Sequence, residues 1–145
     1  MQTKSTWTNP NASELRDLLT RCRHIAVVGL SPKPHRDSHR VALYMQQQGY
    51  TIIPVNPGHP AILGEPCYRN LISIPSDRRI EIVNLFRRSS EVGPHVDEAI
   101  ARKVEAIWMQ FGVVDEAAAE RARSAGILVV MDRCLMVDHA ALIGR

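Results

Sequence analysis

The sequence predicts an α/β fold: a three-layer, Rossmann-like, doubly wound and mainly parallel sheet of five or six strands. Short apolar runs alternate along the chain with segments whose apolar residues have helical spacing, which is typical of βαβ units. Most of these runs are continuously apolar, as expected of strands that are buried on both faces. Right-handed crossovers through helices then join the parallel strands.

Local signals define the elements of the first half of the chain. We predict a helix over 11–21, a strand over 24–29, a helix over 38–48 and a strand over 50–55. Asn11 or Ser13 is suited to capping the first helix, and Ser38 the second, which Gly49 ends. Pro54 is placed at the C-terminal end of its strand, because proline is poorly tolerated inside a central strand.

The second half of the chain begins with a turn over 56–60 and an irregular stretch over 61–75, which includes a short edge strand near 62–63. The remaining predicted elements are a strand over 79–86, a helix over 90–103, a strand over 105–111, a helix over 115–125, a strand over 127–131 and a short helix over 137–143. Pro94 falls in the first turn of its helix, where proline is tolerated. Gly126 ends the helix before the last strand.

Composition excludes several classes of protein. We expect one domain over residues 1–145, a length that is sufficient to bury a core. The net charge of +3 is too small to indicate nucleic acid, and no apolar stretch approaches the length of a membrane span. The three cysteines are widely spaced and odd in number, which favours reduced thiols in the cytoplasm. His35 and His39 have metal-ligand spacing, but no third ligand accompanies them, so no metal is expected.

The residues after the first predicted strand indicate a phosphate-binding loop. Gly29 allows the backbone to approach a ligand closely, and the N-terminus of the following helix supplies a positive dipole. Lys33 and Arg36 add full positive charge to this loop. The stretch is similar to the phosphate-binding turn of a Rossmann unit, although the complete G-x-G-x-x-G pattern is missing.

A second cationic loop follows the strand over 79–86. If the strand order reverses after the irregular stretch, this strand becomes the neighbour of the one over 24–29. Arg87 and Arg88 then face the loop that contains Gly29, at the edge where such sheets bind nucleotides. The two loops together predict a ligand that carries several phosphates.

The end of the second strand restricts which nucleotide fits. NAD sites usually place an acidic residue there to bind the ribose hydroxyls, whereas this chain has Val55, Asn56 and Pro57. NADP stays open as an alternative, because Lys33 and Arg36 are able to bind its additional phosphate. A P-loop nucleoside triphosphatase is excluded, since no G-x-x-x-x-G-K-[ST] sequence is present.

Five motifs follow one another over roughly residues 12–140 and point to one family. They are Ile25-Ala-Val-Val-Gly-Leu-Ser with Lys33 and Arg36, Gly49-Tyr50 leading to Ile53-Pro-Val-Asn-Pro57, Asn84-Leu-Phe-Arg-Arg88, Trp108-Met-Gln-Phe-Gly112 and Met131-Asp-Arg-Cys-Leu-Met136. In these motifs and their order, the chain resembles the small stand-alone coenzyme A (CoA)-binding proteins. Their domain is similar to the N-terminal domain of the succinyl-CoA synthetase α subunit.

The resemblance implies that the chain binds CoA or an acyl-CoA as a small-molecule ligand at the crevice where the strand order reverses. It implies a phosphate loop of Gly29, Leu30, Ser31, Pro32 and Lys33, phosphate contacts from Arg36 and Ser38, an adenine and ribose border of Val55, Asn56 and Pro57, and contacts to pantetheine or a second phosphate from Phe86, Arg87 and Arg88, with Gln110 at the end of its strand. The charge of 3′-phospho-ADP suits several cations.

We expect binding without catalysis. The synthetase uses a phosphorylated histidine in a further domain and a partner subunit, and no equivalent of either is found in this chain. The alternatives are an NADP-dependent oxidoreductase and a nucleotide-binding subunit of a separately encoded acyl-CoA ligase. Two interpretations of Asp132, Arg133 and Cys134 stay open. In one, the segment forms a salt bridge and the Cys134 thiol is buried and neutral; in the other, Cys134 reacts with the thiol of the ligand. Trp108 is expected in the core.

Overall fold

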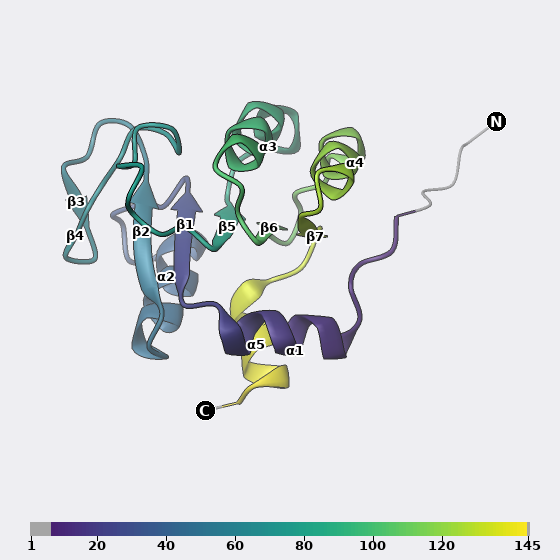
Figure 1. Cartoon of the computed structure of the whole chain (residues 1–145). Coiled ribbons are helices and arrows are strands. Elements are labelled where there is room, and N and C mark those ends of the chain that lie inside the picture. The colour runs from purple at the N-terminus through teal and green to yellow at the C-terminus, as the bar shows by residue number, and fades with distance from the viewer. Residues whose placement is uncertain (1–6, 145) are drawn as a thin grey trace.

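Five parallel strands form the central sheet of the computed structural model, which describes residues 7–144. They lie in the order β2-β1-β5-β6-β7 (Figure 1). Their bounds are His24–Val28 for β1, Thr51–Val55 for β2, Ile82–Leu85 for β5, Ala106–Met109 for β6 and Leu128–Val130 for β7. The predicted α/β class and the doubly wound parallel sheet are confirmed.

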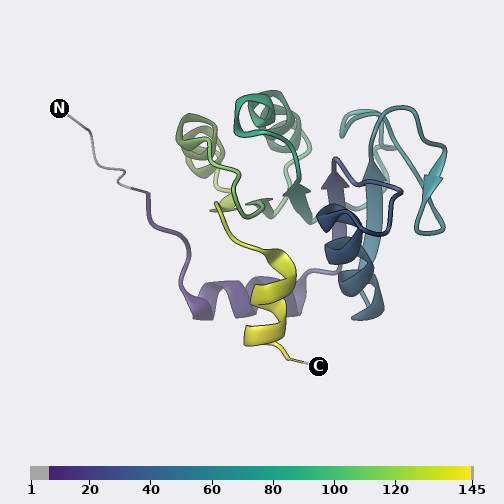
Figure 2. The same ribbon diagram turned by 180° about the vertical axis from the view of Figure 1, so that it is seen from behind.

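Helices cover both faces of this sheet and complete the three predicted layers. The helices are α1 (Ala12–Arg21), α2 (Asp37–Gln47), α3 (Val92–Ala101), α4 (Glu116–Ser124) and α5 (Leu135–Leu142), with a 3₁₀ turn η1 (Ser89–Glu91) before α3. The helices α3 and α4 lie on one face, whereas α1, α2 and α5 lie on the other (Figures 1 and 2). Pro94 lies in the first turn of α3, as predicted.

Alternate residues of the strands contribute to two separate apolar clusters. In β1, Ala26 and Val28 join the cluster on the α3–α4 face, whereas Ile25 and Val27 join the cluster on the opposite face. This follows from the two-residue period of a strand, which directs successive side chains to opposite faces. Because all four side chains are buried, the strand sequence is continuously apolar. Trp108 is fully buried, as predicted.

The helix caps show one correct and one wrong prediction. Asn11 caps α1: its side-chain oxygen accepts a hydrogen bond from the backbone N–H of Glu14 at 2.8 Å, and the Glu14 carboxylate accepts one from the N–H of Asn11. Ser38 does not cap α2, which begins at Asp37 after the cap residue Arg36. The Ser38 hydroxyl instead accepts a hydrogen bond from the backbone N–H of Ser31 at 3.0 Å.

The segment between β2 and β5 is less irregular than predicted. β3 (Ala61–Ile62) and β4 (Glu65–Pro66) pair in antiparallel fashion, so the short strand expected near 62–63 has a partner strand that was not predicted. Pro54 lies next to last in β2, which is an edge strand of the main sheet. No helix within residues 7–144 combines the length and the apolar character that crossing a membrane requires.

Candidate functional site

The strand order reverses between β1 and β5, and the loops that follow these two strands lie in backbone contact. Gly29 follows β1 with φ of +86°, and the backbone oxygen of Phe86 lies so close that an added Cβ would be 2.6 Å from it. The Gly29 N–H donates to the Val55 carbonyl at 2.8 Å, which connects this point to the end of β2. The predicted neighbours are therefore adjacent, and only glycine fits at this position.

Short polar contacts order the loop between β1 and α2. The Ser31 hydroxyl accepts a hydrogen bond from the backbone N–H of Lys33 at 3.1 Å, and the Asn56 side-chain amide donates to the Leu30 carbonyl at 2.7 Å. Leu30 was predicted to line the loop, but its side chain is fully buried in the core, so only its backbone faces the site. The Ser38 hydroxyl is already an acceptor for Ser31.

This loop borders a cavity of about 700 Å³, here called the loop cavity. The predicted residues that line it are Gly29, Ser31, Pro32, Lys33, Arg36, Ser38, Asn56 and Phe86. His35, Asp37 and His59 also line it, although the sequence did not single them out for this role. Lys33 and Arg36 are exposed, and neither side chain forms an ion pair or a hydrogen bond within the described residues. Their charge is available to an anion.

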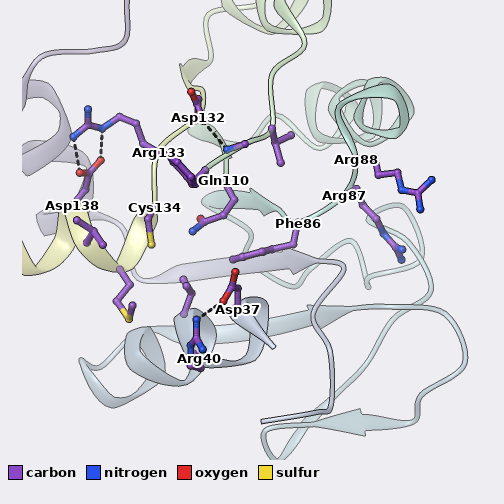
Figure 3. A pocket seen from close by; sticks show the side chains of 16 residues that line it. Asp37, Arg40, Phe86, Arg87, Arg88, Gln110, Asp132, Arg133, Cys134 and Asp138 are labelled. Carbon is purple, nitrogen blue, oxygen red and sulfur yellow. Dashed lines mark hydrogen bonds and ion pairs between the residues drawn. The ribbon is translucent and has the colours of Figure 1, made fainter. Parts of the chain in front are cut away.

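A larger cavity of about 780 Å³, here called the chamber, lies beside the loop cavity and shares Asp37 and Phe86 with it. Its wall includes the predicted residues Phe86, Arg87, Arg88 and Gln110, together with residues of α2, the β6–α4 loop and the start of α5 (Figure 3). The sequence predicted neither the contribution of α5 nor the apolar residues of the β6–α4 loop. The large exposed fraction of Phe111, 74 %, is known only from the structure.

Two ion pairs border the chamber. Arg133 forms a bidentate pair with Asp138, at 2.6 and 2.7 Å, and Arg40 pairs with Asp37 (Figure 3). The side-chain oxygen of Asp132 accepts a hydrogen bond from the backbone N–H of Gly112 at 2.6 Å. The salt bridge expected of the 132–134 segment is thus present, with Asp138 as the partner of Arg133. The hydrogen bonds to Asp138 are the main reason why the pKa of the Arg133 guanidinium is raised.

Gln110 is the most buried of the predicted site residues that present a polar side chain to the chamber, at 6 % exposed. Its side-chain oxygen accepts hydrogen bonds from the Asn84 amide and from the backbone N–H of Leu135. Asn84 is fully buried in β5 and also donates to the Trp108 carbonyl. Gln110 is therefore held from below by the sheet and from the side by α5.

A small cavity of about 340 Å³ lies on the other side of Arg87. Val55 and Pro57, predicted near adenine and ribose, line it together with Arg69, Glu91 and His95. Burial lowers the pKa of His95, and its Nδ1 has no hydrogen-bond partner among residues 7–144. The side chains of Arg87 and Arg88 form no ion pair there or elsewhere in the described chain. The three cavities thus adjoin one another along the carboxyl edge of the sheet.

The three cysteines are free thiols in different surroundings. Burial raises the pKa of Cys22 to about 11. Burial likewise raises the pKa of Cys67, whose thiol donates to the Asn56 carbonyl at 3.2 Å. The expectation of a buried thiol at Cys134 is wrong, because Cys134 is partly exposed in the chamber wall. Within the described part of the chain, no cluster of three or more His, Cys, Asp or Glu side chains is arranged to hold a metal ion.

Comparison with known proteins places this geometry in a family. Residues 23–140 match the model of a family described as a CoA binding domain. The chain is 42% identical over 132 residues to the uncharacterized protein YneT of Bacillus subtilis (strain 168), and the match covers 91% of this chain and 96% of that protein. A structure described as a hypothetical protein from Pyrococcus horikoshii OT3 has a TM-score of 0.90 at 35% identity, over 99% of this chain and 100% of that chain.

A larger enzyme shares the fold. Dinucleotide-forming acetyl-coenzyme A synthetase 1 of Ca. Korarchaeum cryptofilum, solved with phosphate and ADP, has a TM-score of 0.68 at 21% identity. The match covers 79% of this chain but 27% of the synthetase chain, and it shows similarity of fold alone. The family match covers most of the chain, and the resemblance predicted from the sequence is confirmed. The chain therefore belongs to the CoA binding domain family.

Proposed function

We propose that this protein binds CoA or an acyl-CoA across the three adjoining cavities and catalyses no reaction of its own. The proposal treats residues 1–145 as one binding domain. The observation that carries it is the group of cations at the reversal point: Lys33, Arg36, Arg87 and Arg88 have no acidic partners within the described residues. Unpaired cations gathered at one edge of a sheet favour a polyanionic ligand.

In this proposal, each predicted residue contacts a defined part of the ligand. The pyrophosphate lies in the loop cavity, against the backbone of 29–33 and the side chains of Lys33, Arg36 and Ser38. Val55, Asn56 and Pro57 border the adenosine, and Arg87 lies between that region and the chamber. The pantetheine arm enters the chamber past Phe86, Arg88 and Gln110. The position of Gly29, Ser31, Pro32 and Lys33 in the wall of the loop cavity supports this arrangement.

The polar groups of the chamber favour binding over catalysis. Asp138 is buried and held by Arg133 in a bidentate ion pair, which disfavours a role as a general base. Asp37 forms an exposed pair with Arg40. An NADP-dependent oxidoreductase uses the same edge of the sheet and is the competing proposal. A ligase subunit is a further alternative, and would show turnover only when its partner is present.

Calorimetry with CoA, dephospho-CoA, NADP and NAD separates these proposals. We expect CoA to bind most tightly and dephospho-CoA more weakly, since it lacks one phosphate for the unpaired cations. NADP binding at least as tight as that of CoA would overturn the proposal. Purified protein analysed by native mass spectrometry should retain a ligand with the mass of CoA or an acyl-CoA.

Two double variants that remove the same charge test where the phosphates of CoA bind. Lys33→Ala with Arg36→Ala should weaken CoA binding about tenfold or more and reduce its dependence on salt. Arg21→Ala with Arg123→Ala removes the same charge from a cavity at the opposite edge of the sheet and should leave the affinity nearly unchanged. Equal effects of the two double variants would mean that the phosphates bind elsewhere.

A further inference from the structure

One half of the Gln110 carboxamide is fixed by the protein. Its Oε1 accepts hydrogen bonds from Asn84 Nδ2 at 3.2 Å and from the Leu135 backbone N–H at 3.3 Å. Asn84 is itself oriented, because its Nδ2 also donates to the Trp108 carbonyl at 3.2 Å. Both partners of Oε1 are therefore donors, so the amide orientation follows from the hydrogen bonds and Nε2 lies on the remaining side.

The Nε2 group of Gln110 is a donor without an acceptor. No acceptor contacts it within residues 7–144, although the side chain belongs to a residue that is only 6 % exposed. Figure 3 shows Gln110 pointing into the chamber between Cys134 and Phe86. Nε2 is not among the fully buried atoms that lack a partner, so it is accessible from the chamber, and a ligand that offers an acceptor at this point gains a hydrogen bond. An uncharged carbonyl oxygen has the required chemistry.

The surroundings of Gln110 are mostly apolar. Six side chains supply this surface: Val41, Phe86, Phe111, Val113, Met136 and Val137. Phe111 and Val137 are 74 % and 57 % exposed, which is unusual for large apolar residues in the wall of a cavity. The nearby carboxylates of Asp37 and Asp138 are already paired with arginines. The chamber thus combines the Gln110 donor with an apolar surface, and the unpaired Arg87 and Arg88 lie in the same wall.

We infer that the chamber binds the acyl end of a neutral acyl thioester, with Gln110 Nε2 donating to the thioester carbonyl oxygen. The alkyl chain lies against Phe111 and Val137, and Cys134 lies beside it in the wall. The inference rests on the proposed function, because the chamber adjoins the loop cavity at Asp37 and Phe86 and the pantetheine arm joins the two. The physiological ligand is then an acyl-CoA rather than free CoA.

Four ligands distinguish the contribution of the thioester carbonyl to the affinity from that of the alkyl chain. We propose calorimetry with CoA, butyryl-CoA, hexanoyl-CoA and S-butyl-CoA, a thioether that has a chain but no thioester carbonyl. Each methylene that enters the chamber should raise the affinity about three- to fourfold, so hexanoyl-CoA binds more tightly than butyryl-CoA. Butyryl-CoA should bind about five- to tenfold more tightly than S-butyl-CoA, because only the thioester accepts from Gln110.

Two kinds of variant test the assigned residues. Gln110→Glu keeps an acceptor for Asn84 and Leu135 but removes the donor, so it should abolish the difference in affinity between butyryl-CoA and S-butyl-CoA. Gln110→Ala should abolish the same difference. Phe111→Ser should reduce the gain from chain length, and folding should be unaffected because Phe111 is largely exposed. Ile72→Ser is the matched control, since Ile72 is also an exposed apolar residue, at 52 %, and lies outside the chamber wall. It should leave all four affinities unchanged.

Alkylation of Cys134 provides a readout that does not depend on the variants. Acyl-CoA should slow the reaction of Cys134 with iodoacetamide, followed by mass spectrometry of the intact wild-type protein. Equal affinities for all four ligands, with Cys134 unprotected, would overturn the inference while leaving CoA binding intact. If no ligand bound at all, the proposed function itself would fall. Phe111→Ser could instead dissociate a dimer and leave the dependence of affinity on alkyl-chain length unchanged. This surface would then be an interface between copies of the protein, and the inference would be wrong.

Discussion

Substitution of Gly29 tests the contact on which the site depends. A Cβ at this position would lie 2.6 Å from the backbone oxygen of Phe86, and φ is +86°, a region that L residues rarely occupy. The left-handed conformation alone costs an alanine about 1–2 kcal/mol. The overlap with the backbone adds roughly 1–3 kcal/mol, because β1 and β5 must move apart. Gly29→Ala should therefore destabilise the protein by about 2–5 kcal/mol.

Gly126→Ala is the matched control for this experiment. Gly126 has nearly the same φ, +85°, but a Cβ added there would meet no atom within 4 Å. Its substitution should cost only the conformational part, about 1–2 kcal/mol. Urea denaturation followed by circular dichroism gives both values as free energies of unfolding. If the two variants were equally destabilised, the close approach of Gly29 to Phe86 would contribute nothing, and the reasoning would be refuted.

Three further predictions concern stability and reactivity. Burial lowers the pKa values of His95 and His139, so both bind protons more readily in the unfolded chain; the free energy of unfolding should decrease as the pH falls below about 6.5, and constant stability there would contradict this. Asn11→Ala removes the α1 cap and should cost about 1 kcal/mol in urea denaturation, whereas no loss would mean that the cap is dispensable. Because Cys22 is fully buried with its pKa raised to about 11, iodoacetamide should modify native protein at Cys134 well before Cys22; the reverse order would show that the chamber wall is closed.

The positions of the strands were predictable because their signals are local. In β1, each residue from 25 to 28 is apolar, which reflects burial on both faces of the sheet. Gly29 stands directly after this run. The sequence predicted that it allows the backbone to approach a ligand, whereas the group that lies against it in the structure is the backbone oxygen of Phe86. Helix boundaries are less predictable because they depend on contacts outside the helix. Ser38 has the chemistry of a helix cap, but its hydroxyl accepts a hydrogen bond from Ser31, seven residues earlier in the chain.

The chamber could not be predicted from any single segment. Gln110 owes its orientation to Asn84 and Leu135, which lie 26 and 25 residues away along the chain. Arg133 pairs with Asp138, in the first turn of α5, and not with the adjacent Asp132. The motif that contains Gln110 was recognised, but the direction of its amide depends on contacts that exist only after β5, β6 and α5 have packed.

Local sequence signals were sufficient to predict the alternation of strands and helices, the glycine at the end of β1 and the cationic residues that follow β1 and β5. These features depend on side-chain periodicity, backbone freedom and charge, which are properties of neighbouring residues. Packing of distant segments sets which cations stay unpaired, where Leu30 and Ser38 direct their side chains, and how α5 contributes to the chamber beside Gln110. The physical reason is that burial and hydrogen-bond partnership are set by residues far apart in the chain, which meet only in the folded protein.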